Sequence, residues 1–351
     1  MIVNMKDETV FRCKIKNLDT SLWVLMDGVI AGTQKDENLE KGVSVLQNED
    51  GNGLQIIISE NVKVIKPIQI VSAIQTLQPL KLIQNFKIIL EKNASLTLVH
   101  CDDSLQKEKT DILNNVEITL FENAVMNYYK MENKDAGSVL TNKITVHQKA
   151  NSQFYSNVIT FNAGKVNNFL YVSLNEPFAD AQLNGLYLVD KKQHIHNEVK
   201  VFHHSPDCTS KQLYKGIADD EAQAVFNGHI IVQKDAQRTA AFQVNKNIAL
   251  TDEAHIRTQP FLEIYADDVK CSHGATVGQL DEEALFYLRS RGICQKNARM
   301  LLMFAFTNEV AQTVKIDALR DRLSQMIQQR LKGELHICSQ CALHCEQHQK
   351  N

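Results

Sequence analysis

The sequence predicts a mainly β protein whose body is a β-helix and whose C-terminal part is a small helical unit. Short β-type segments separated by polar turns run from about residue 54 to residue 280. A polar residue or two followed by alanine recurs between these segments. The pattern then changes to helical periodicity at residue 281. These three observations together favour a solenoid body that ends in helices.

The β-type segments follow one another without an intervening helix. The first four are LQIIIS (54–59), VKVIKPIQIV (62–71), FKIIL (86–90) and SLTLV (95–99). Because no long helical stretch separates them, the pattern disfavours a βαβ architecture. A solenoid, a sandwich and an open antiparallel sheet remain as alternatives.

The recurring alanines favour the solenoid among these alternatives. They stand at Ala94, Ala124, Ala150 and Ala179, with separations of 30, 26 and 29 residues. Unequal spacing of this kind is typical of stacked rungs joined by loops of varying length. A small residue also fits a corner where adjacent coils approach closely. We therefore interpret residues 51–280 as a β-helix core and residues 1–50 as a lead-in or cap.

Residues 281–334 predict a compact helical region. DEEALFYLRSRG has Asp281 as its N-cap, acids in the first turn and Gly292 as its terminator. A strongly apolar helix follows over 295–314, and an amphipathic one over 316–333. A unit this small is expected to dock on the β body or on a partner.

The composition is that of a soluble globular protein. The 351 residues are 44% hydrophobic and 23% charged, with a net charge of −3. Such a balance disfavours a nucleic-acid partner, and no apolar run is long enough to span a membrane. Eight cysteines without a visible export signal indicate thiols or metal ligands in a reducing, cytoplasmic setting.

Cys271 and His273 form the first candidate metal site, in DDVKCSHGATVG. On a strand they project from one face about 6.5 to 7 Å apart, which suits two ligands of one soft metal ion. A tetrahedral site needs two more ligands, from a neighbouring strand or a second chain. The alternative is a buried cysteine beside a hydrogen-bonded histidine.

A second candidate lies in the Cys/His-rich tail, residues 335–351. Cys338 and Cys341 have a Cys-x2-Cys spacing, Cys345 follows, and His348 is one of the histidines able to complete the set. Zinc or an iron–sulfur cluster fits such ligands, whereas a terminus without a metal is the alternative.

A weaker metal candidate lies on one face of a predicted strand, where His194, His196 and Glu198 alternate. The alternative for these three residues is a solvated polar face.

Residues 199–306 resemble a known family. The segments HHSPDCTSKQLYKGI and AVFNGHIIVQKDAQRTAAFQVNKNIALTDEAHIRTQPFLEIYADDVKCSHGATVGQLDEEALFYLRSRGI together resemble the SufB/SufD family of iron–sulfur cluster assembly proteins. The CSHG at 271–274 resembles the SufD branch, because SufB carries a different, glutamate-containing sequence there.

The resemblance implies a right-handed parallel β-helix followed by C-terminal helices. It implies a non-catalytic, cytosolic scaffold that pairs with SufB and rests on a SufC ATPase. His273, with Cys271 beside it, would hold iron or a nascent iron–sulfur cluster transiently at the SufB interface. For ATPase docking we expect the following aromatic and apolar anchors, which could instead pack the helices on the body: Phe286, Tyr287, Met303, Phe304 and Phe306.

Two features depart from the resemblance, and two other functions stay open. The N-terminal segment shows no helical domain like that of many SufD proteins, and no family role transfers to the tail cysteines.

One alternative function is an interaction protein whose tail is held in place by a zinc ion. Another is a β-helix enzyme acting on polysaccharide. The open end of a β-helix also invites pairing between two copies of the isolated chain.

Overall fold

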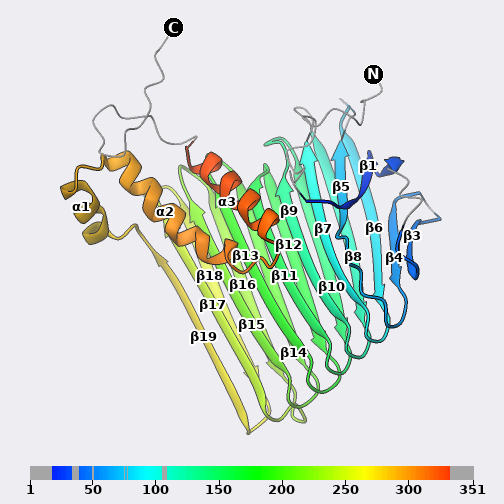
Figure 1. Cartoon of the computed structure of the whole chain (residues 1–351). Coiled ribbons are helices and arrows are strands. Elements are labelled where there is room, and N and C mark those ends of the chain that lie inside the picture. The colour runs from blue at the N-terminus through cyan, green and yellow to red at the C-terminus, as the bar shows by residue number, and fades with distance from the viewer. Residues whose placement is uncertain are drawn as a thin grey trace.

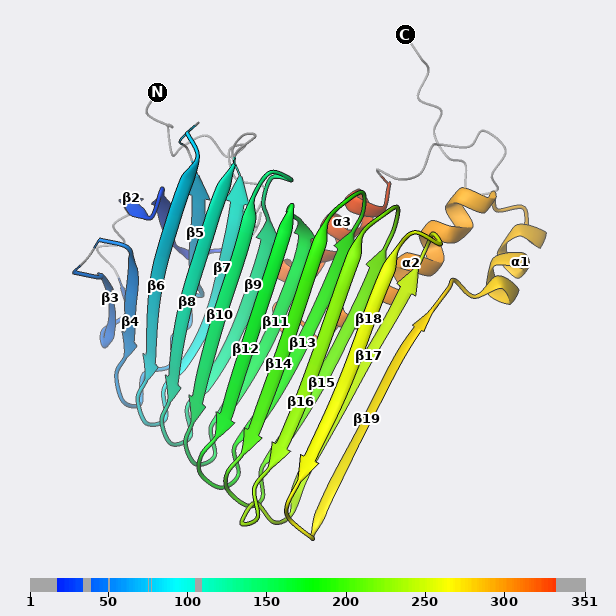
Figure 2. The ribbon, with the colours of Figure 1, turned by 180° about the vertical axis from the view of Figure 1, so that it is seen from behind.

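The computed structural model describes residues 18–33, 39–49, 51–74, 76, 78–104 and 109–332. It shows a long parallel β-solenoid with helices along one side (Figures 1 and 2). Each coil contributes one strand to each of two facing sheets. Within the described residues, sheet A has the order β19-β17-β15-β13-β11-β9-β7-β5-β1-β2, and sheet B the order β18-β16-β14-β12-β10-β8-β6-β4-β3.

The strands have the following bounds: β1 Ser21–Met26, β2 Val29–Thr33, β3 Val43–Gln47, β4 Gly53–Ile58, β5 Ile68–Ile74, β6 Leu80–Leu90, β7 Ser95–Ser104, β8 Thr110–Leu120, β9 Val125–Asn133, β10 Val139–Gln148, β11 Gln153–Asn162, β12 Lys165–Leu174, β13 Asp180–Val189, β14 His194–His203, β15 Thr209–Ala218, β16 Gln223–Val232, β17 Thr239–Ala249, β18 His255–Ile264 and β19 Val269–Gly278. The predicted mainly β fold is confirmed.

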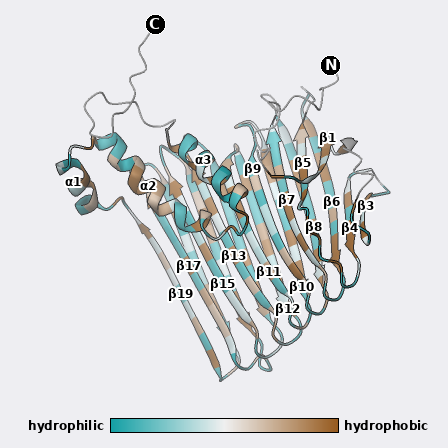
Figure 3. Cartoon of the chain, in the orientation of Figure 1, coloured by the Kyte–Doolittle hydropathy of each residue, from teal (hydrophilic) through white to brown (hydrophobic). Residues whose placement is uncertain are grey.

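Neighbouring coils pair in parallel and in register. Lys165 of β12 pairs with Val139, 26 residues earlier, whereas His255 of β18 pairs with Gln223, 32 residues earlier. The coil length therefore varies, as the unequal alanine spacing predicted, and the parallel solenoid is confirmed. Side chains alternate between the interior and the outer face along each strand, which gives the banded hydropathy of Figure 3.

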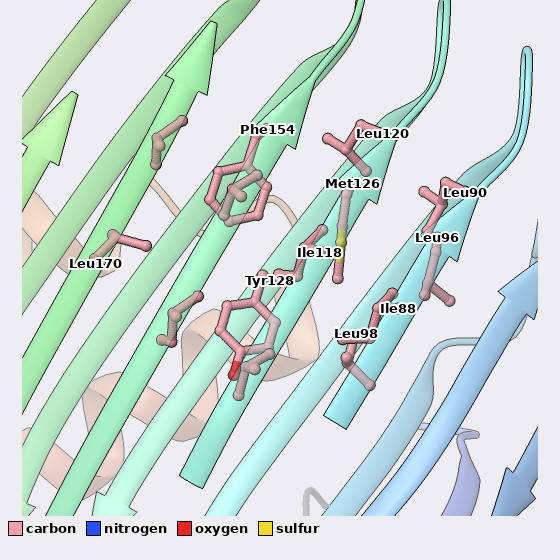
Figure 4. Packing of buried hydrophobic residues seen from close by; sticks show 14 of the residues in the cluster. Ile88, Leu90, Leu96, Leu98, Ile118, Leu120, Met126, Tyr128, Phe154 and Leu170 are labelled. Atoms are coloured by element: carbon pink, nitrogen blue, oxygen red, sulfur yellow. The ribbon is translucent and has the colours of Figure 1, made fainter. Parts of the chain in front are cut away.

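Apolar columns fill the interior of the N-terminal coils. Leu96, Met126 and Phe154 follow one another in register through β7, β9 and β11, and none of the three is more than 1% exposed. They face Ile88 and Ile118 of sheet B (Figure 4). Burial of apolar surface in such columns stabilises the stack by roughly 1.5–3 kcal/mol for each large side chain.

The corners of the coils explain the recurring alanines. Ala94, Ala124 and Ala179 are buried, and Ala150 is half-buried. Asn93 and Asn123 precede two of them in the left-handed backbone region, which asparagine tolerates better than most residues. Their side chains form a ladder, since Asn123 Nδ2 donates to Asn93 Oδ1 at 2.9 Å.

The three predicted helices are α1 Glu282–Ser290, α2 Gln295–Ala311 and α3 Asp317–Lys332. The Asp281 carboxylate accepts from the backbone N–H of Ala284, and Gly292 has a φ of 85°, so both ends of α1 are as predicted. Figure 1 shows α2 and α3 lying along the outer face of sheet A, where their apolar side chains share one cluster with those of the strands.

Polar contacts fix these helices to sheet A. The Arg330 guanidinium of α3 pairs with Asp190 at 2.8 Å and donates to the carbonyl oxygen of Phe161 at 3.0 Å. Lys215 of β15 donates to the carbonyl oxygen of Phe306 at 2.9 Å and pairs with Glu309 of α2. Contacts of this kind hold α2 and α3 in one position on the solenoid.

At the N-terminal end, two antiparallel hairpins complete the sheets. β1 pairs in parallel with β5 and antiparallel with β2, while β3 and β4 form the second hairpin. The segment interpreted as a lead-in thus contains strands that continue sheets A and B.

Candidate functional site

The last coil leaves two strand edges without a neighbour in the described part of the chain. β19 ends sheet A beside β17, and β18 ends sheet B beside β16. The backbone N–H and C=O groups along such an edge are available for pairing with another chain. This end of the solenoid lies below α1 and α2, opposite the N-terminal hairpins (Figure 2). The open end is therefore a surface suited to a partner.

Cys271 and His273 share one face of β19, as the strand alternation predicted, and the register with β17 shows that this face points inward. Cys271 is in register with Ala241 of β17, and His273 is in register with Gln243. Both β17 residues are buried, so Cys271 lies next to a buried apolar side chain and His273 next to a buried polar one. The structure therefore places the pair on a single face at the open end.

The two side chains differ in environment. Cys271 is partly buried and packs against the apolar cluster of Ile230, Val232 and Ala266, whereas His273 is exposed. Burial raises the pKa of the Cys271 thiol, and a hydrogen bond from the backbone of Ala241 offsets part of that rise. Because the thiolate is the metal-binding form, this raised pKa disfavours the form of Cys271 that binds a metal.

Sequence reasoning missed the polar side chains beneath this pair. Gln243, Asn245 and Asn247 all face the interior from β17 and are buried. Asn247 Nδ2 donates to Asn245 Oδ1 at 2.6 Å, and Asn245 Nδ2 donates to the carbonyl oxygen of Tyr214 at 3.2 Å. The alternation of β17 was visible in the sequence, but the pairing register that sets these residues under β19 was not.

The weaker histidine candidate on β14 is engaged in hydrogen bonds on the outer face of sheet B. Asn227 Nδ2 lies 3.1 Å from His196 Nε2. Glu198 accepts from the Tyr171 hydroxyl at 2.6 Å and pairs with Lys200 at 2.9 Å. Within the described residues, no three His, Cys, Asp or Glu side chains are grouped to hold a metal ion. A complete metal site on this chain alone is therefore not formed in that region.

The predicted docking residues fall into two groups. Phe286 and Tyr287 of α1 are 72% and 56% exposed. Met303 is 2% exposed, and Phe304 and Phe306 pack against the same cluster between α2 and sheet A. The contact of Met303, Phe304 and Phe306 with an ATPase stays a prediction, and in this structure their side chains attach α2 to the body.

A groove of about 500 Å³ lies where α1 meets α2. Phe286, Arg289, Ile293 and Cys294 are among the residues that line it. Figure 1 shows α1 standing away from the sheets beyond the end of α2. An exposed aromatic side chain beside an open groove is a common anchor for a partner protein.

The tail candidates Cys338, Cys341, Cys345 and His348 lie outside the described residues. In the part of the chain that the structure describes, no helix has both the length and the apolar character required to cross a membrane.

Comparison with known proteins identifies the family. Residues 74–306 match the family model described as "SUF system FeS cluster assembly, SufBD core domain". The chain is 41% identical over 160 residues to the iron–sulfur cluster assembly protein SufD of Escherichia coli, covering 46% of this chain and 38% of that protein.

Two further relatives extend this similarity. An iron–sulfur cluster assembly SufBD family protein of Synechocystis is 31% identical over 281 residues, covering 77% of this chain and 62% of that protein. The chloroplastic protein ABCI7 of Arabidopsis thaliana is 32% identical over 209 residues, covering 59% of this chain and 44% of that protein. The alignments thus span less than two thirds of these relatives. With the SufBD core model matched over most of the solenoid, the chain belongs to the SufBD family of iron–sulfur cluster assembly proteins and is SufD-like.

Proposed function

We propose that this chain is a scaffold subunit of an iron–sulfur cluster assembly complex. In this proposal the open end of the solenoid pairs with a SufB-like subunit, and the nascent cluster forms between the two chains. The observation that carries the proposal is the position of Cys271 and His273 on the terminal strand, beside edges that have no neighbour among the described residues. Membership in an assembly family supplies the identity of the cargo.

The site chemistry fits a half-site that a second chain completes. An imidazole nitrogen and a thiolate are ligands for iron, but two protein ligands do not fill its coordination sphere. The exposed His273 side chain is accessible to iron and to a partner without rearrangement of the coil. Cys271 would bind only after iron or a cationic partner group favours its thiolate, because burial raises the pKa of its thiol.

The same proposal assigns ATPase docking to α1. Phe286 and Tyr287 are exposed next to the groove between α1 and α2. Lys215 and the apolar cluster fix α2 to sheet A. A movement of the ATPase that displaces α1 would therefore be transmitted through α2 to the solenoid. ATP hydrolysis would belong to the ATPase subunit, and this chain would position the cluster site without catalysing a reaction itself.

The experiment compares His273→Ala with the control His255→Ala in the complex with SufB-like and SufC-like subunits. His255 is an exposed histidine on the neighbouring terminal strand β18. We expect both variants to co-purify with the partners, and only His273→Ala to lose cluster formation, measured by anaerobic absorption spectroscopy. Normal cluster formation in His273→Ala would remove His273 from the site, and loss of co-purification would make its role structural.

A further inference from the structure

The Gln243 side chain is a buried amide without a hydrogen-bond partner among the described residues. It is 1% exposed, and neither Oε1 nor Nε2 makes a hydrogen bond. A buried polar group in that state lowers the stability of the folded chain. Most such groups in proteins find a partner, so the amide of Gln243 is expected to serve a ligand or a side chain that approaches it.

The space around the amide leaves few partners. Gly228 of β16 faces it from sheet B, and a Cβ on that glycine would overlap the Gln243 amide. In the next coil Gly228 is in register with Pro260, which has no backbone N–H to donate. On β17 itself the neighbouring inward residues are Ala241, which is apolar, and Asn245, which already bonds to Asn247 and Tyr214.

The polar side chains in register with Gln243 are Gln212 below it and His273 above it. Gln212 is 3% exposed, and its amide atoms also make no hydrogen bond within the described part of the chain. Parallel strands are about 4.8 Å apart, so an imidazole on β19 that turns toward the coil below reaches the amide of Gln243. The two glutamines therefore form a polar column that ends under His273.

We propose that Gln243 is a positioning residue for His273. The imidazole donates its N–H to Oε1 of Gln243, which fixes the ring tautomer and directs the other ring nitrogen toward the open end as a metal ligand. Metal-binding histidines are commonly oriented by such a second hydrogen bond, and its loss weakens metal binding about 10- to 100-fold. This assignment rests on the proposed function of His273 as a metal ligand. It adds Gln243 as the residue that orients the His273 ring.

The proposal predicts that removing the Gln243 amide weakens metal binding without lowering the stability of the fold. Gln243→Met replaces the amide with an apolar side chain of similar length, so the unfolding midpoint in denaturant should stay the same or rise. Gln212→Met makes the same replacement one coil deeper, on β15, which does not pair with β19. It is therefore the matched control. A purely structural role for Gln243 predicts a lower midpoint instead.

The first readout uses the isolated chain, without partner or iron. Histidine-selective ¹⁵N labelling, with the His273 signal assigned by its loss in His273→Ala, reports the ring tautomer. We expect one dominant tautomer in the unmodified chain and in Gln212→Met, and a shift toward the ratio of a free imidazole in Gln243→Met. The same tautomer ratio in all three proteins would overturn the proposal.

The second readout is iron and cluster binding by the complex with a SufB-like subunit. Gln243→Met should weaken binding of ferrous iron about tenfold, and Gln212→Met should leave it unchanged. An equal loss in both variants would mean a general effect on the coil and would contradict a specific role for Gln243. If His273→Ala leaves cluster formation intact while the tautomer shift is seen, the proposed function fails and the Gln243–His273 contact stands.

Discussion

Lys130 Nζ lies 2.7 Å from a carboxylate oxygen of Asp102 inside the solenoid, and neither side chain is more than 2% exposed. The two residues lie on adjacent strands of sheet A, β9 and β7, with Asp102 two positions beyond the register partner of Lys130. Asn114 of sheet B donates to the same carboxylate at 3.2 Å. This buried ion pair joins consecutive coils along sheet A and opposes a slip in their register.

Breaking this pair should destabilise the fold strongly. Lys130→Met leaves the Asp102 carboxylate buried without its cation, and we expect the free energy of unfolding to fall by about 3–5 kcal/mol. The double variant Lys130→Met/Asp102→Asn removes both charges and should recover most of that loss. Urea unfolding followed by circular dichroism measures both effects. A loss below about 1 kcal/mol in Lys130→Met would contradict this account.

Stability should fall in acid because of His203. Burial lowers the pKa of His203 to about 3 from the ordinary value of 6.5, and its Nε2 lies 2.9 Å from Ser210 Oγ. The unfolded chain takes up a proton below pH 6.5 while the folded chain does not until about pH 3. This group therefore lowers the free energy of unfolding across that range as pH decreases, by up to about 1.4 kcal/mol per pH unit.

His203→Gln tests this contribution, because glutamine does not titrate. Its unfolding free energy should depend less steeply on pH between 6.5 and 3 than that of the unmodified chain. His194→Gln, at an exposed position on the same strand, is the control for the substitution itself. Parallel curves for His203→Gln and the unmodified chain would show that His203 does not cause the acid loss.

Cys271 should react slowly with alkylating reagents while the chain is folded. Burial raises the pKa of its thiol, so the reactive thiolate is scarce at neutral pH. Iodoacetamide labelling at this cysteine, quantified by peptide mass spectrometry, should be several times slower in buffer than in urea and should accelerate as pH rises. Equal rates in buffer and urea would contradict the partly buried environment of Cys271.

Phe286 should contribute binding energy to the ATPase and little to folding. Its side chain is 72% exposed on α1, so Phe286→Ala should change the unfolding free energy by less than about 0.5 kcal/mol. Loss of a central aromatic anchor costs about 2 kcal/mol, or about thirty-fold in Kd. Calorimetry with a SufC-like ATPase measures the change.

Phe178→Ala is the matched control for this prediction, since Phe178 is 59% exposed at a corner of the solenoid far along the chain from α1. It should leave the affinity for the ATPase unaltered. Unchanged affinity in Phe286→Ala would move the docking surface away from α1.

The sequence predicted local structure well wherever one short pattern determines it. Strand alternation predicted that Cys271 and His273 share one face, because successive side chains of a strand point to opposite sides. The N-cap at Asp281 and the stop at Gly292 predicted both ends of α1. The turn alanines predicted stacked coils, and Ala94, Ala124 and Ala179 are buried at the corners where successive coils meet.

The tertiary structure alone decided which residues of different coils meet. Gln243 and His273 are separated by a full coil in the sequence, and only the register of β17 with β19 brings them together. The burial of Met303 against sheet A likewise depends on where α2 docks. Local patterns carry no information about such contacts, because coil lengths vary and each insertion in a corner resets the pairing of the next strand. The sequence by itself therefore determined the type of fold and the candidate ligand pair, whereas the coil register determined the residues around that pair.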